Sequence, residues 1–94
     1  MEKYSIVRGD RSGVFFGKIE SRNGREVTLR DVRRLWYWDG AASISELAVE
    51  GPSRPQNCKF PVPVDKIVLT DVIEIDECTE AAVKAIKEVP LWVG

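Results

Sequence analysis

The sequence RDVRRLWYWDGAASISEL, residues 30–47, indicates the fold, because a pattern typical of a β-strand is followed by one typical of a helix start. Its first part places Arg34, Trp36 and Trp38 at alternate positions, as on one face of a β-strand. Its second part contains Ser43 and Glu46 at the spacing of a capping box, in which the serine caps a helix and the glutamate reaches back to the serine amide. A strand followed by a helix within one short segment predicts a domain that mixes β and α structure.

The residues before this segment predict a β-meander. Residues 3–8 and 14–21 alternate in the manner of two strands, and Gly17 is placed for a bend or a bulge in the second strand. The pair Asn23-Gly24 predicts a type I′ hairpin, because both central residues of that turn need a positive φ.

Residues 26–38 are long for a single strand, and their alternation slips at Val32. We therefore expect a bend near Arg30-Asp31, at which one strand ends and another begins. Strong bending of a meander with a glycine in its second strand is a feature of small barrels of the SH3 or Sm type.

Two helices are expected in the second half of the chain. The helix that begins after Ser43 should end at Gly51, since glycine readily adopts the conformation that terminates a helix. Thr79 is placed to cap a last helix over residues 80–88, and Pro90 ends it.

The segment between the helices is expected to be extended. Residues 60–64 alternate apolar side chains with prolines, which excludes a fully paired central strand. Residues 66–76 are typical of one strand with Asp71 exposed. Residues 1–94 are therefore predicted to form a single α+β domain: a small, strongly bent antiparallel sheet or SH3/Sm-like barrel with one short internal helix and a C-terminal helix.

Charge limits the expected partners. The formal net charge of −1 argues against a general duplex DNA binder, which usually has a strongly basic surface. Residues 1–54 nevertheless carry ten Lys or Arg against eight Asp or Glu, whereas residues 55–94 carry four against seven. A locally basic site on a nearly neutral protein suits a small anionic ligand better than a long polyanion.

The chain lacks histidine, and its two cysteines, Cys58 and Cys78, are far apart in the sequence. The sequence therefore lacks the residues that usually form zinc sites and Cys-His or Ser-His catalytic pairs. We expect free thiols in a reducing cytoplasm, no metal, no cofactor and no enzymatic activity. There is also no charged-then-apolar leader and no apolar run of about 18 residues, so neither secretion nor a membrane span is expected.

The aromatic and basic residues of the opening segment are the candidate ligand site. If Arg34, Trp36 and Trp38 line a cleft, the indoles could stack a base while Arg33 or Arg34 pairs with a phosphate. Free amides at the helix start, near Ser43 and Ser45, would add an anion site. The alternative is purely structural: tryptophans in the core or a subunit interface, arginines on a solvated rim, and Ser43 as a plain helix cap.

The sequence also resembles a known family. The resemblance covers nearly the whole chain and is carried by GVFFGKIESRNGREV (13–27), RRLWYW (33–38), SISELA (43–48) and CKFPVPV (58–64). The family consists of small domains of uncharacterised function that are encoded mainly by tailed phages and prophages. It implies no established active site.

Phage origin would imply a binding role directed at the host. The function expected first is non-enzymatic: a homo-oligomer in the host bacterial cytoplasm that sequesters a small nucleotide-like signalling molecule and so counters bacterial immunity. The alternative is a protein-binding inhibitor or adaptor that uses the same aromatic surface against a host protein. A third possibility, single-stranded nucleic-acid binding on an SH3-like or Sm-like barrel, is disfavoured by the neutral charge.

Overall fold

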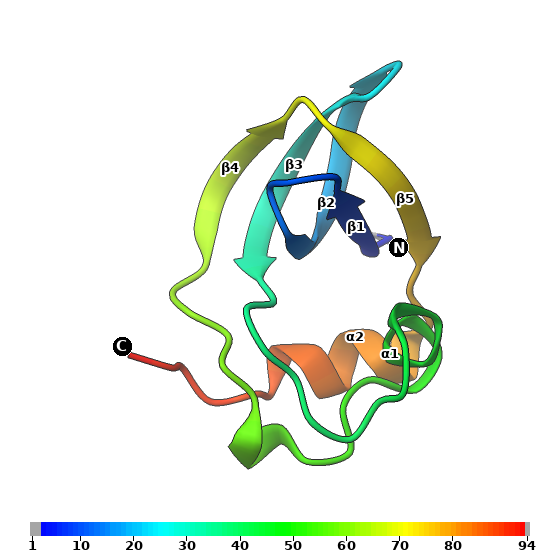
Figure 1. Cartoon of the computed structure of the whole chain (residues 1–94). Helices are drawn as coiled ribbons and strands as arrows, with labels where there is room; N and C mark the ends of the chain where they lie inside the picture. Colours follow the sequence, from blue (N-terminus) through cyan, green and yellow to red (C-terminus); the bar gives the residue numbers. More distant parts are fainter. Residues whose placement is uncertain (1–2, 94) are drawn as a thin grey trace.

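The structure, a computed structural model, describes residues 3–93 and has the expected α+β architecture. Five strands form one antiparallel sheet in the order β4-β3-β2-β1-β5, accompanied by two helices (Figure 1). A 3₁₀ turn, Pro55–Asn57, lies in the long connection after the first helix. The elements are β1 (Ser5–Gly9), β2 (Val14–Asn23), β3 (Glu26–Arg34), α1 (Ile44–Glu50), β4 (Val64–Leu69), β5 (Val72–Glu77) and α2 (Glu80–Lys87).

The strand order forces the sheet to curl. β4 and β5 form its two opposite edges, yet only Thr70 and Asp71 separate them along the chain. The two edges must therefore meet at that turn, and Figure 1 shows them converging there and diverging toward the helices. The expected strong bending is confirmed, whereas the single strand expected over residues 66–76 is wrong because these two residues reverse the chain.

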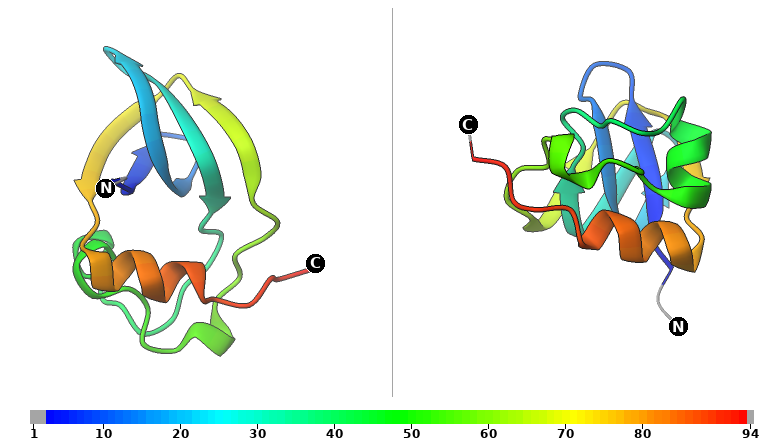
Figure 2. Two further views of the ribbon diagram at one scale, coloured as in Figure 1. Left: turned by 180° about the vertical axis from the view of Figure 1, so that it is seen from behind. Right: turned by 90° about the horizontal axis from the view of Figure 1, so that it is seen from below.

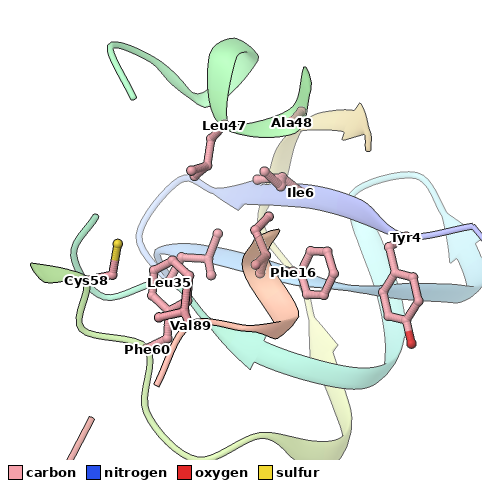
Figure 3. Close-up of a cluster of buried hydrophobic side chains, with 10 residues drawn as sticks. Tyr4, Ile6, Phe16, Leu35, Leu47, Ala48, Cys58, Phe60 and Val89 are labelled. Carbon is pink, nitrogen blue, oxygen red and sulfur yellow. The ribbon is translucent and has the colours of Figure 1, made fainter. Parts of the chain in front are cut away.

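The pair β1–β2 has a hydrophobic core on each side. Val7 and Phe15 face each other across the pair and belong to the core inside the curled sheet. Ile6 and Phe16, the next pair in register, point the opposite way, into a core formed with α1, α2 and the connecting loops (Figure 3). Both helices thus cover the outer face of the sheet, as the view from below shows in Figure 2.

The bend in β3 lies where the sequence indicated it, but the strand continues through it. Asp31 has a φ of 53°, and the register of the β2–β3 pair shifts opposite Gly17. A Cβ at Gly17 would lie 3.1 Å from the Arg30 carbonyl oxygen, which is a tight contact, so glycine favours this close approach. Aspartate is one of the few residues that tolerate the left-handed conformation, and the bulge turns β3 without ending it.

The β2–β3 hairpin is confirmed, but its turn is displaced by one residue. Asn23 is the last residue of β2 and pairs with Glu26, which leaves Gly24 and Arg25 as the loop. Gly24 has a φ of 61°, whereas neither Asn23 nor Arg25 has a positive φ. The expected type I′ turn is therefore wrong, since glycine at the first central position followed by an ordinary residue is the pattern of a type II′ turn.

Both predicted helix caps are present. The Ser43 hydroxyl accepts a hydrogen bond from the Glu46 amide at 3.2 Å, and Thr79 accepts one from the Ala82 amide at 3.1 Å. The Glu46 carboxylate accepts a bond from the Ala42 amide at 3.2 Å, whereas an ideal capping box uses the amide of the cap residue itself. Gly51 ends α1 with a φ of 75°.

Asp71 holds the loop between β1 and β2. Its carboxylate accepts hydrogen bonds from the amides of Arg11 at 2.8 Å and Ser12 at 3.0 Å, and from the Ser12 hydroxyl at 2.7 Å. The expectation of an exposed Asp71 is wrong, because the backbone donors of this tight loop need an acceptor. These hydrogen bonds hold the pKa of Asp71 below its ordinary value, and the bond from the Arg11 amide has the largest effect.

We predict that Asp71→Asn lowers the free energy of unfolding at neutral pH. The variant should also lose part of the decrease in stability that the wild-type protein shows as the pH falls. Because the folded-state pKa is lowered, the contribution of Asp71 is complete above its unfolded pKa of about 4 and is lost as the pH falls through the folded pKa. Urea unfolding should show a difference between wild type and variant that shrinks below about pH 4. Asp10→Asn, in the same loop, is the matched control, and a difference that does not change with pH would contradict this account.

Candidate functional site

The three aromatic and basic residues expected on one face of a strand do not lie on one strand. β3 ends at Arg34, and in the segment 35–38 only Tyr37 forms a β-bridge, with Lys59. Arg34, Trp36 and Trp38 therefore do not project from one strand, and that geometric expectation is wrong. The Leu35 amide still donates to the Val14 carbonyl at 2.9 Å, and the Leu35 side chain lies in the core beneath the helices, where it is 2 % exposed.

Arg33 is the most constrained of the candidate residues. Its side chain is 9 % exposed, and its two terminal nitrogens donate to three carbonyl oxygens: Ile86 at 3.1 Å, Phe60 at 3.2 Å and Pro90 at 3.2 Å. The guanidinium also lies 5.4 Å from the centre of the Phe60 ring. Arg33 thus joins β3 to the end of α2 and to the strand-like segment before β4.

The positive charge of Arg33 has no anionic partner among residues 3–93. Its partners are neutral carbonyls and a ring face, and no carboxylate of this part of the chain lies within 4.0 Å of it. The Arg33 Nε is buried without a hydrogen-bond partner. Burial lowers the pKa of the guanidinium, yet arginine stays charged in proteins. Burying a charge without a counter-ion is costly, so an anion nearby would be stabilised.

A pocket of about 490 Å³ lies beside Arg33, and we call it the Arg33 pocket. Lys87, at the end of α2, is the second cation of its wall. Asp31, at the bulge of β3, is its carboxylate and accepts a 2.5 Å hydrogen bond from the Tyr4 hydroxyl. The remaining lining residues are apolar: Phe16, Pro63, Val89 and Leu91.

A larger hollow of about 590 Å³ lies on the other side of Lys87, along α2. It brings Lys3, Lys84 and Lys87 together with the carboxylates of Glu77 and Glu80. These charges sum to +1, and all three lysines are exposed, so water screens their charges. The Arg33 pocket, with its buried and uncompensated cation, is therefore the better candidate for a ligand site.

Arg34 points to the opposite side of β3 from Arg33. Its guanidinium lies 4.5 Å from the centre of the Phe15 ring, and one terminal nitrogen donates to the Ser12 carbonyl at 3.0 Å. Arg34 therefore stabilises the β1–β2 loop. Arg34 does not line the Arg33 pocket.

The two tryptophans lie in different environments. Trp38 packs against the core beneath the helices, whereas Trp36 is 65 % exposed. Near them, the Lys59 ammonium lies 5.7 Å from the ring centres of both Tyr37 and Trp92. We refer to these three residues as the Tyr37–Lys59–Trp92 surface.

Ser43 and Ser45 lie at the start of α1 and away from Arg33. The Ser43 hydroxyl is engaged as the helix cap, and Ser45 is exposed. Neither lines the Arg33 pocket. Of the six residues expected to form one ligand site, only Arg33 contributes to this pocket.

Sequence reasoning did not find Asp31, Lys87 or Leu91 as site residues. They come from the bulge of β3, the end of α2 and the tail after it, which only the tertiary fold brings together. The predicted bend near Asp31 was the one available signal, because a bulge can aim a side chain out of a sheet. Lys87 looks like an ordinary cation in the last turn of a helix.

A comparison with protein-family models gives one match. The model described as Domain of unknown function (DUF6948) matches residues 2–86. The chain belongs to this family. The part of the DUF6948 domain that matches contains all five strands, α1 and α2 up to Ile86, so Lys87, Val89 and Leu91 of the pocket wall lie just beyond it.

Further comparisons add no relative from which a function could be carried over. No curated protein and no solved structure matches this DUF6948 chain. Residues 3–93 contain no group of three or more cysteine or carboxylate side chains placed to hold a metal ion. Within the same part of the chain, no helix has the length and apolarity needed to cross a bilayer.

We predict that Arg33→Met destabilises the protein by about 2–5 kcal/mol, because three buried carbonyls lose their donor. Arg34→Met is the matched control and should cost about 1 kcal/mol, since Arg34 is exposed. Urea unfolding at neutral pH measures both. If the two variants were equally stable, the structural role assigned to Arg33 would be wrong.

Proposed function

We propose that this protein is a non-enzymatic binding protein that captures a small, nucleotide-like anion in the Arg33 pocket. The observation that carries the proposal is the buried guanidinium of Arg33, which has no carboxylate partner within residues 3–93 and forms part of the pocket wall. An anionic ligand would supply the missing counter-charge. Lys87, on the same wall, adds a second cation with a flexible stem.

The size and lining of the pocket suit a ligand with an anionic group and a flat apolar part. Its volume of about 490 Å³ falls in the range of small-molecule sites, which are mostly apolar with a few polar groups that fix orientation. Pro63 and Leu91 provide apolar contacts, and Leu91 is 56 % exposed. A nucleobase would pack against them, while a phosphate faces Arg33 and Lys87.

In this proposal the protein is encoded by a phage and acts in the cytoplasm of its bacterial host. By holding a nucleotide messenger of an immune pathway, it would lower the free concentration of that messenger without chemical change. A homo-oligomer is part of the proposal, and the exposed Trp36, Tyr37 and Val93 are apolar residues available for contacts between copies.

A second candidate function rests on the Tyr37–Lys59–Trp92 surface. Tyr37 is 50 % exposed, and exposed aromatic residues beside a cation are frequent at protein interfaces. This surface would serve an inhibitor or adaptor that binds a host protein. Single-stranded nucleic-acid binding stays a weaker expectation, since the net charge of −1 offers little attraction to a polyanion.

We predict that one class of nucleotide raises the melting temperature of the wild-type protein. A ligand that binds only the folded state stabilises it by about 2.7 kcal/mol at 100 times its Kd, and a small domain gains about 4–8 °C per kcal/mol. A rise of about 10 °C or more is therefore expected in thermal unfolding with a panel of linear and cyclic nucleotides and ADP-ribose derivatives.

Lys87→Gln should abolish most of this rise, because it removes the mobile cation of the pocket. Lys84→Gln is the matched control: Lys84 also lies in the last turn of α2 but does not line the Arg33 pocket. No response to the panel, together with capture of a defined host protein that Tyr37→Ala prevents, would reject the ligand proposal in favour of the adaptor.

A further inference from the structure

The charges of the Arg33 pocket limit the charge of its ligand. Arg33 and Lys87 contribute two positive charges, and Asp31 contributes one negative charge, so the wall carries a net charge of +1. We infer that the ligand presents a phosphodiester, which carries a single negative charge, rather than a terminal phosphate monoester, which carries nearly two at neutral pH. This inference rests on the proposed function and specifies its ligand class.

The donors of Arg33 point to the same ligand class. Nη2 donates both of its N–H groups and Nη1 donates one of its two to carbonyl oxygens, so neither edge of the guanidinium has the two free N–H groups that bind a terminal phosphate in a bidentate manner. Its Nε is shielded from solvent. Arg33 therefore acts on a ligand through its charge, and Lys87 provides the mobile N–H donors of the pocket wall. A diester, with only two free oxygens, needs fewer donors than a monoester.

Asp31 is held at the pocket in a fixed position. The Tyr4 hydroxyl donates a 2.5 Å hydrogen bond to it, and the Tyr4 ring is stacked on Phe16 at 4.8 Å between centres. The Lys87 ammonium lies 4.3 Å from the centre of the same ring. The carboxylate therefore stays close to the cation that a phosphate would approach, and its repulsion acts twice as strongly on a dianion as on a monoanion.

The first experiment compares two phosphates on the same nucleoside. Isothermal titration calorimetry of the wild-type protein at about pH 8 uses the 3′,5′-cyclic phosphates of adenosine, guanosine, cytidine and uridine, together with their 5′-monophosphates. For the nucleoside that binds, the cyclic diester should bind more tightly than the monoester. Near pH 5 the monoester takes up a proton and becomes singly charged, so the preference should shrink there.

Asp31→Asn tests the origin of the preference. Asparagine tolerates the φ of 53° at this position, and its side-chain oxygen can still accept the bond from Tyr4, so the substitution removes charge with little change of shape. The affinity for the monoester should rise relative to that for the diester by about threefold, the effect of one unit charge at several ångströms in a water-like dielectric. Asp65→Asn, on the exposed edge of β4, is the matched control and should leave the ratio unchanged.

The outcomes separate this inference from the proposed function. Equal binding of diester and monoester, or a preference for the monoester, overturns the inference and leaves the proposed function standing. No binding of any nucleotide overturns both. A short single-stranded oligonucleotide is titrated in parallel, because its backbone is also a phosphodiester: tighter binding to it than to the cyclic nucleotides would support the diester and overturn the small-ligand function.

Discussion

The structure depends most on the hydrogen bonds that the Arg33 guanidinium donates to the carbonyls of Phe60, Ile86 and Pro90. Those carbonyls belong to segments that are remote from β3 along the chain, and one side chain at the end of β3 satisfies them all. The last turn of α2 and the segment after it are thereby fixed to the outer face of the sheet. Since the bonds run to neutral oxygens, they hold the arginine in place without cancelling its charge.

The same arrangement creates the candidate site. β1 and β2 carry apolar side chains on both faces, so one face fills the curled sheet and the other accepts the helices. Lys87 at the end of α2 and Asp31 at the bulge of β3 both line the Arg33 pocket, and Arg33 lies in its wall. Arg33 therefore contributes both to the stability of the fold and to the candidate site. Substitutions of Lys87 and Asp31 are the better probes of binding.

Local patterns predicted the local structure well. The caps at Ser43 and Thr79, the stop at Gly51 and the bend opposite Gly17 follow from conformational preferences of individual residues, which act over a few positions. The turn at Thr70-Asp71 was missed because Asp71 is stabilised there by the distant amides of Arg11 and Ser12, and no neighbour in sequence signals that.

The site was predicted less well because strand alternation was extended past the end of β3. Beyond Arg34 the regular strand ends, and Trp36 is exposed whereas Trp38 packs against the core beneath the helices. Arg33 was identified as a candidate from the sequence. Its burial was not predicted, because it follows the bend at Asp31 and cannot be read from the alternation of polar and apolar residues. Its partner Lys87 could be assigned only once the packing of α2 was known.

The most direct test of the central claim is an NMR titration that follows the Nε–H signals of the arginine side chains. If the buried charge of Arg33 is the counter-ion of a nucleotide phosphate, adding the ligand should shift the Arg33 signal progressively to saturation, while the Arg34 signal on the opposite side of β3 stays in place. Saturable binding that leaves the Arg33 signal unchanged would show that the ligand is held elsewhere, and would contradict the assignment of the site.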